Sequence, residues 1–162
     1  QVHDFYEPAN IKGNSVYIYT ASKAPEVYGN DIYEEVIEKL KGKFNFILCE
    51  AKTTNNIKSI YKQCFIGLRL TRFDGLGCTN IELGLMGLKS VSNNLSPNCL
   101  PWKTADDVIQ HILNESNKIE TSDPKLADQT LSFISKEYEI LKLAHKEKEE
   151  KSLWHRFKSL FH

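Results

Sequence analysis

Residues 64–70, CFIGLRL, form a run that is apolar at every position except Arg69. Successive side chains of a β-strand point to opposite faces of its sheet, so a strand of this composition is buried on both sides. A parallel sheet with helices on both faces provides that environment. The run therefore predicts a central strand of a helix-covered parallel sheet. Arg69 either pairs with a buried acid there or reaches a ligand.

Strand-like and helix-like segments alternate on either side of this run. Runs of β-branched and aromatic residues predict further strands, at 16–21, 44–48 and 89–92. Apolar residues at helical spacing predict helices, at 30–42, 79–86 and 104–117, and a short helix that ends at Tyr61. Asp31 and Glu34 fit a capping pair for the first of these helices. This order favours an α/β fold with a doubly wound, mostly parallel, Rossmann-like sheet.

The composition changes near residue 122. The chain has 162 residues, which is enough for one hydrophobic core but short for two. We expect a Rossmann-like domain at 1–121 and a helical extension at 122–162. Asp123 can cap this extension and Pro124 can occupy its first turn. Residues 152–162 show a second amphipathic pattern, which favours a helix with one apolar face.

Charge and cysteine content exclude several classes of protein. Lys plus Arg and Asp plus Glu both number 21, so no overall field attracts nucleic acid, and we expect no nucleic-acid partner. The four cysteines have no spacing typical of a zinc site, and reduced thiols suit a cytoplasmic protein. No apolar run approaches 18 residues, so we expect no membrane-spanning segment.

The segment after residue 70 carries the residues that indicate function. Asp74 and Glu82 lie eight positions apart around a turn with Gly75 and Gly77, and a predicted helix begins at Thr79. Glycines allow a ligand to approach the backbone, and the N–H groups that open a helix bind phosphate. Carboxylates accept hydrogen bonds from neighbouring hydroxyl groups, as on a ribose or a hexose. A diphosphate flanked by two polyols describes a nucleotide sugar, so we expect the Rossmann-like domain at 1–121 to be a nucleotide-sugar-binding domain.

Residues 74–82, DGLGCTNIE, resemble the acid-x7-acid signature EGFGLPxxE of retaining glycosyltransferases with the GT-B fold, of the group 1 or family 4 type. The signature belongs to the C-terminal, donor-binding half of those enzymes, and the likeness covers residues 16–116. Glu82 matches the second acid of the signature. Asp74, Cys78 and Thr79 replace its first Glu, its Leu and its Pro.

The resemblance implies a role for each matching residue. Glu82 would hold the ribose hydroxyls, Asp74 would approach the donor sugar, and these two are the implied catalytic residues. Backbone amides of the glycine-rich turn would hold the diphosphate, assisted by a lysine of the first loop. The implied donor-binding residues are Lys23, Gly75, Leu76, Gly77, Cys78, Thr79 and Glu82. The chain has no Asp-x-Asp motif, so we expect neither a metal ion nor a cofactor.

The implied function is transfer of a sugar, of the hexosyl type, from a nucleotide diphosphate sugar to a glycan, lipid or protein acceptor, with retention, in polysaccharide or glycoconjugate biosynthesis. The acceptor would bind an N-terminal domain outside these residues, so the chain alone would be inactive. Residues 152–162 would dock on that domain or contact a membrane peripherally. The alternative is a non-catalytic α/β module that binds a nucleotide or a protein. In that case Asp74 serves a turn, and Thr79 and Glu82 form a capping box.

Overall fold

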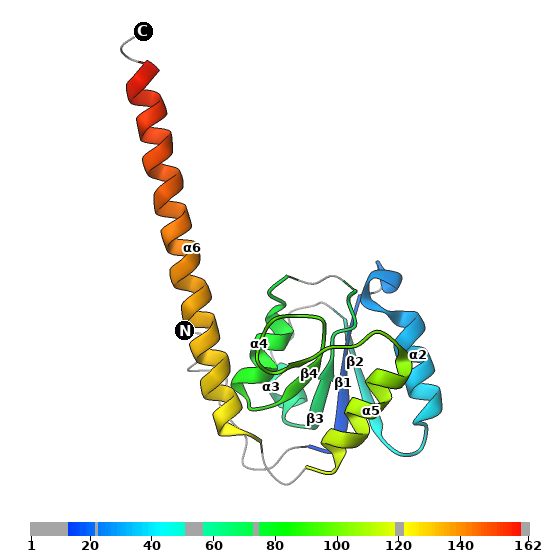
Figure 1. The fold of residues 1–162 in the computed structure, drawn as a ribbon. Helices are drawn as coiled ribbons and strands as arrows, with labels where there is room; N and C mark the ends of the chain where they lie inside the picture. Colours follow the sequence, from blue (N-terminus) through cyan, green and yellow to red (C-terminus); the bar gives the residue numbers. More distant parts are fainter. Residues whose placement is uncertain (1–12, 22, 51–56, 73–74, 119–121, 160–162) are drawn as a thin grey trace.

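The structure, a computed structural model, describes residues 13–21, 23–50, 57–72, 75–118 and 122–159. Within them, five strands form one sheet in the order β2-β1-β3-β4-β5, and every pairing is parallel (Figure 1). The strands are β1 (Ser15–Thr20), β2 (Asn45–Glu50), β3 (Cys64–Leu68), β4 (Lys89–Val91) and β5 (Cys99–Leu100). The helices are η1 (Pro25–Tyr28), α2 (Asn30–Lys39), α3 (Ile57–Tyr61), α4 (Cys78–Leu85), α5 (Ala105–Ser116) and α6 (Pro124–Ser159).

Helices cover both faces of the sheet (Figure 1). Val16 and Ile18 of β1 point to the face covered by α2 and α5, and Tyr17 points to the face covered by α3, α4 and α6. All five residues of β3 are buried, as the apolar run predicted. The doubly wound parallel α/β fold is therefore confirmed. The two-residue β5 was not predicted, because a strand this short has no periodicity to detect.

Two of the helix starts follow from local sequence, and one does not. Thr104 and Asp107 form a capping box at α5, and the Asp123 side chain accepts hydrogen bonds from two backbone N–H groups at the start of α6. The predicted capping pair of α2 is wrong. Gly29, with φ of 68°, precedes that helix without any side-chain cap, and Asp31 instead forms an ion pair with Arg72 at 3.2 Å.

A buried ion cluster joins the start of β4 to the end of α5. The Glu115 side chain is 4% exposed, and one of its oxygens lies 3.2 Å from the ammonium groups of both Lys89 and Lys118. Burial by itself raises the pKa of Glu115, but hydrogen bonds and charge from the two lysines outweigh burial, and the pKa lies below its ordinary value. The cluster therefore favours the ionised carboxylate.

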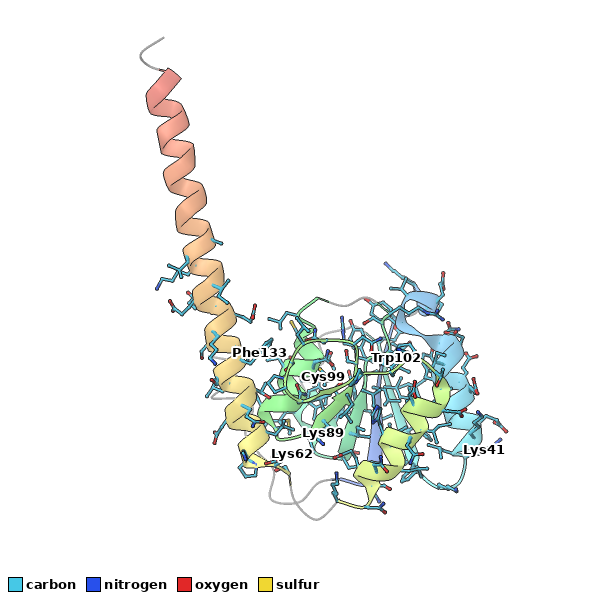
Figure 2. All side chains as sticks on the ribbon, viewed as in Figure 1. Lys41, Lys62, Lys89, Cys99, Trp102 and Phe133 are labelled. Carbon is cyan, nitrogen blue, oxygen red and sulfur yellow. The ribbon has the colours of Figure 1, made fainter. Side chains whose placement is uncertain are left out.

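The helix α6 packs on α4 near its start and then extends away from the domain (Figure 1). A Cβ on Gly84 of α4 would lie 2.5 Å from Thr130 Oγ1, so the two helices approach closely there. Phe133 points from α6 toward the domain (Figure 2). Further along, Tyr138 is 63% exposed. Residues 152–159 continue the same helix, and none of the helices in the described part of the chain is long and apolar enough to cross a membrane.

Candidate functional site

The strand order has a switch point between β1 and β3. These strands are neighbours, yet the chain leaves them in opposite directions along the sheet, toward β2 and toward β4. In open α/β sheets, ligands bind outside the carboxyl ends of the strands at such a reversal. The loops that follow β1 and β3 meet there, because a Cβ on Gly29 would lie 2.6 Å from the Leu70 carbonyl oxygen. The ion pair between Arg72 and Asp31 joins the same two segments.

The glycine-rich turn leads from the segment after β3 into α4. The Gly77 N–H donates to the Gly75 carbonyl at 3.0 Å, and the helix begins at Cys78, one residue before the predicted start. The N–H groups of Cys78 and Thr79 occupy the first helical positions, which have no acceptor within a helix. A Cβ on Gly75 would meet no atom within 4 Å. Internal packing therefore does not require glycine at position 75, and the space beside it is open.

The carboxylate of Glu82 is half-buried and lies between α4 and α3. The hydroxyl of Tyr61, the last residue of α3, donates to Glu82 Oε2 at 2.7 Å. The alternative role of Glu82 in a capping box with Thr79 is wrong, because Gly77 is the residue before the helix and no side chain caps it. Glu82 therefore interacts with a neighbouring helix and not with its own N-terminus.

Tyr61 connects Glu82 to the centre of the sheet. Its ring meets the ring of Tyr17 edge to face, with centroids 5.1 Å apart. Burial raises the pKa of Tyr17 well above its usual value, and the nearby Cys49 and Glu82 act in the same direction, while a hydrogen bond with Tyr61 opposes them. The Tyr17 phenol therefore stays protonated at neutral pH. Sequence analysis did not identify Tyr61, since only its position at a helix end was visible.

Three other predicted site residues are exposed, and one lies outside the described residues. Lys23 is exposed in the loop after β1, on the carboxyl edge that also carries the glycine-rich turn. Leu76 is 49% exposed in that turn, and Cys78 is exposed at the start of α4. Asp74 lies outside the described residues, so its predicted contact with the donor sugar stays a prediction.

Arg69 supplies a second basic group at the same edge. Its guanidinium carbon lies 4.4 Å from the centre of the Tyr19 ring and 5.9 Å from the centre of the Tyr28 ring. These distances fit cation–π contacts between the end of β1, η1 and the end of β3. Close by in sequence, the hydroxyl of Thr71 is buried and has no hydrogen-bond partner among the described residues. Sequence analysis left open whether Arg69 pairs with a buried acid or reaches a ligand, and it gave Thr71 no role.

A network of buried hydrogen bonds connects the first turn of α4 to β4 and to the segment after β4. Asn80 is fully buried, its Oδ1 accepts from the Ser90 hydroxyl at 2.7 Å, and its Nδ2 donates to the Ser92 hydroxyl at 3.0 Å. Asn98 Nδ2 donates to the Asn80 carbonyl at 2.8 Å, and Asn98 Oδ1 accepts from Ser96. The network fixes α4 against β4 and the segment that follows β4.

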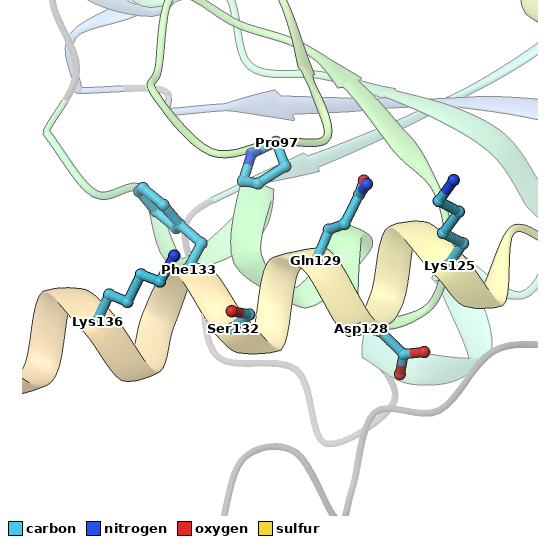
Figure 3. Close-up of a pocket in the computed structure, with 7 residues that line it drawn as sticks. All are labelled: Pro97, Lys125, Asp128, Gln129, Ser132, Phe133 and Lys136. Carbon is cyan, nitrogen blue, oxygen red and sulfur yellow. The ribbon is translucent and has the colours of Figure 1, made fainter.

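An open groove of about 580 Å³ lies between the segment after β4 and α6 (Figure 3). Gln129 and Phe133 extend from α6 toward the side on which Pro97 lies. The groove includes none of the predicted site residues. In the described part of the chain, no three His, Cys, Asp or Glu side chains gather as metal ligands. The four cysteines are free, and burial, together with the nearby Cys49, raises the pKa of Cys64 to about 12.

Comparison of the chain with protein-family models, with curated proteins and with solved structures found no match.

Proposed function

We propose that this chain is the donor-binding half of a glycosyltransferase that transfers a sugar, with retention, from a nucleotide diphosphate sugar to a glycan, lipid or protein acceptor. The main support is the half-buried Glu82 carboxylate, whose Oε2 is held by Tyr61 at 2.7 Å. It lies on the helix that begins at the glycine-rich turn, after the switch point between β1 and β3. The resemblance of residues 74–82 to the acid-x7-acid signature supports the same function.

In this proposal, the protein binds the donor through three kinds of group. Glu82 accepts hydrogen bonds from the ribose hydroxyls, and Asp74 approaches the donor sugar. The first N–H groups of α4 bind the diphosphate, assisted by the exposed Lys23. As the bond to the sugar breaks, negative charge develops on the departing nucleotide diphosphate. Fixed N–H groups and a lysine stabilise that charge without rearranging, an effect that often supplies much of an enzyme's rate enhancement.

The remaining part of the active site belongs to an N-terminal domain outside these residues. That domain binds the acceptor, and the apolar face of residues 152–162 docks on it. Three large apolar side chains at the carboxyl edge of the sheet are exposed and available for such a contact, namely Val27, Leu76 and Leu95.

A non-catalytic nucleotide-binding or protein-interaction module is the competing function. One observation favours it: the buried hydroxyl of Tyr61 needs an acceptor, and Glu82 supplies one whether or not a ligand binds. The two functions differ in their requirement for a nucleotide sugar. A protein-interaction module needs no nucleotide, and a non-catalytic nucleotide binder transfers no sugar when the N-terminal domain is present.

Saturation-transfer NMR with a panel of nucleoside diphosphates and nucleotide sugars tests the proposal. We expect weak binding of at least one nucleotide, and Glu82→Ala should lower its affinity about 10- to 100-fold, because a charged hydrogen bond to ribose is lost. Glu34→Ala, which removes an exposed glutamate from α2 on the other face of the sheet, is the matched control and should leave binding unchanged.

Transfer assays separate the donor-binding half from a complete enzyme. The purified chain should show no sugar transfer, and transfer should require the N-terminal domain. Binding of no nucleotide by the folded chain, or equal binding by the Glu82→Ala protein, would refute the ribose role of Glu82. Efficient turnover by these 162 residues alone would refute the division of the active site.

A further inference from the structure

Tyr61 is a rigidly held hydrogen-bond donor to the Glu82 carboxylate. Tyr61 is 1% exposed and its ring is held edge to face against Tyr17, with an angle of 77° between the ring planes. Glutamate has three side-chain torsions, and the Glu82 side chain is only half-buried. Without a partner, its carboxylate would sample several rotamers. The hydrogen bond from the Tyr61 hydroxyl selects one position of that carboxylate.

The hydrogen bond also leaves most of the acceptor capacity of Glu82 available. An ionised carboxylate accepts about four hydrogen bonds, two at each oxygen. Tyr61 uses one site at Oε2, and Oε1 has no donor among the residues that the structure describes. The thiol of Cys64, three residues after Tyr61, donates to the Ile60 carbonyl at 3.3 Å. Glu82 is therefore held at one oxygen and open at the other.

This geometry suits recognition of two adjacent hydroxyl groups. A ribose presents its 2′ and 3′ hydroxyls side by side, and a carboxylate in a fixed orientation accepts from both without losing further rotamer freedom on binding. We propose that Tyr61 is a positioning residue that holds Glu82 so that the site selects nucleoside diphosphates with an intact ribose 2′,3′-diol. This inference rests on the proposed function and adds to it a residue outside the acid-x7-acid segment, together with a selectivity for the sugar of the nucleotide.

A purely structural role for Tyr61 makes a different prediction. In that case the hydrogen bond only satisfies a buried hydroxyl, so removing the hydroxyl changes protein stability and affects every nucleotide equally. A positioning role affects only those nucleotides that donate to Glu82. The distinguishing quantity is the ratio of affinities for a ribonucleoside diphosphate and its 2′,3′-dideoxy counterpart.

The experiment measures this ratio by titration calorimetry for the wild type and for Tyr61→Phe. This variant keeps the edge-to-face ring contact with Tyr17 and removes the hydrogen bonds of the Tyr61 hydroxyl to Glu82 and Tyr17. The ligands are the diphosphates of uridine, guanosine and adenosine and the 2′,3′-dideoxy form of each. We expect Tyr61→Phe to lower the affinity for the preferred ribonucleotide about 3- to 10-fold and to leave the dideoxy affinity within about twofold. Tyr33→Phe, at a buried tyrosine on the other face of the sheet, is the control and should change neither.

Three results would overturn the inference. Two of them would leave the proposed function intact, and the third would refute it as well. The first is that Tyr61→Phe lowers the affinity for both nucleotide forms equally, and the second is that it lowers neither. If Glu82→Ala still weakens binding, either result would refute the role of Tyr61 and leave the proposed function intact. Binding of no nucleotide by the folded wild type would refute the proposed function and this inference together. Should Tyr61→Phe fail to fold, Tyr61→His takes its place, because the histidine ring is too short to put a donor where the Tyr61 hydroxyl lies. The same loss of ribose selectivity is expected, and wild-type selectivity in that protein would overturn the inference.

Discussion

Replacing Asn80 with alanine tests whether the buried network behind α4 stabilises the fold. The side chain of Asn80 is fully buried and bonds to Ser90 at 2.7 Å and to Ser92 at 3.0 Å. Asn80→Ala removes both hydrogen bonds and leaves two fully buried hydroxyl groups with one partner fewer. Each lost bond between neutral groups costs about 0.5 to 1.5 kcal/mol, and the unsatisfied hydroxyls and the vacated volume add to this cost.

We therefore expect Asn80→Ala to lower the free energy of unfolding by about 2 to 4 kcal/mol, measured by urea denaturation followed by circular dichroism. Asn114→Ala is the matched control. Asn114 is exposed on α5 and accepts only a long hydrogen bond of 3.4 Å from Gln110, so its replacement should change stability by less than about 0.5 kcal/mol.

A double-mutant cycle gives the sharper test of the same network. Ser92→Ala should cost less in the Asn80→Ala background than in the wild type, because the Ser92 hydroxyl has then already lost its partner. Additive costs, or a loss below about 1 kcal/mol for Asn80→Ala alone, would contradict the argument that these bonds hold α4 against β4.

Two further predictions concern stability. Glu115→Gln should cost about 1 to 2 kcal/mol at pH 7, a value kept low because the two lysine partners are partly exposed. The folded pKa of Glu115 lies below its unfolded value. The difference in free energy of unfolding between the wild type and Glu115→Gln should therefore be complete above the unfolded pKa and disappear as the pH falls through the folded pKa. An unchanged difference at about pH 3 would contradict this prediction. Gly84→Ala places a Cβ 2.5 Å from Thr130 Oγ1 and should cost about 1 to 3 kcal/mol while speeding amide exchange at the start of α6. Gly75→Ala, whose Cβ would meet nothing within 4 Å, is its control and should leave stability unchanged, and equal effects of the two substitutions would refute the packing argument.

The sequence by itself determined the fold class. An apolar run on both faces of β3 requires helices on both sides of a sheet, and this requirement depends only on the alternation of side chains along a strand. The starts of α5 and α6 were equally visible. Their caps join residues two or three positions apart, and such bonds form from local sequence alone.

Tertiary structure decided the partners of the polar side chains near the predicted site. The pattern Thr79-x-x-Glu82 offered a local capping bond as the alternative role of Glu82, but the partner of Glu82 is Tyr61, 21 positions away. Asn80 likewise bonds to Ser90 and Ser92, which lie 10 and 12 positions away, in and directly after β4.

The physical reason is the range of each interaction. Burial of apolar surface is non-directional, so its periodicity along the chain reveals which face of an element is covered. A hydrogen bond is directional and requires a donor within about 3 Å of its acceptor, and only the packing of neighbouring elements brings such a pair together. The order of strands in the sheet places α3 beside α4, and that arrangement gives Glu82 its partner.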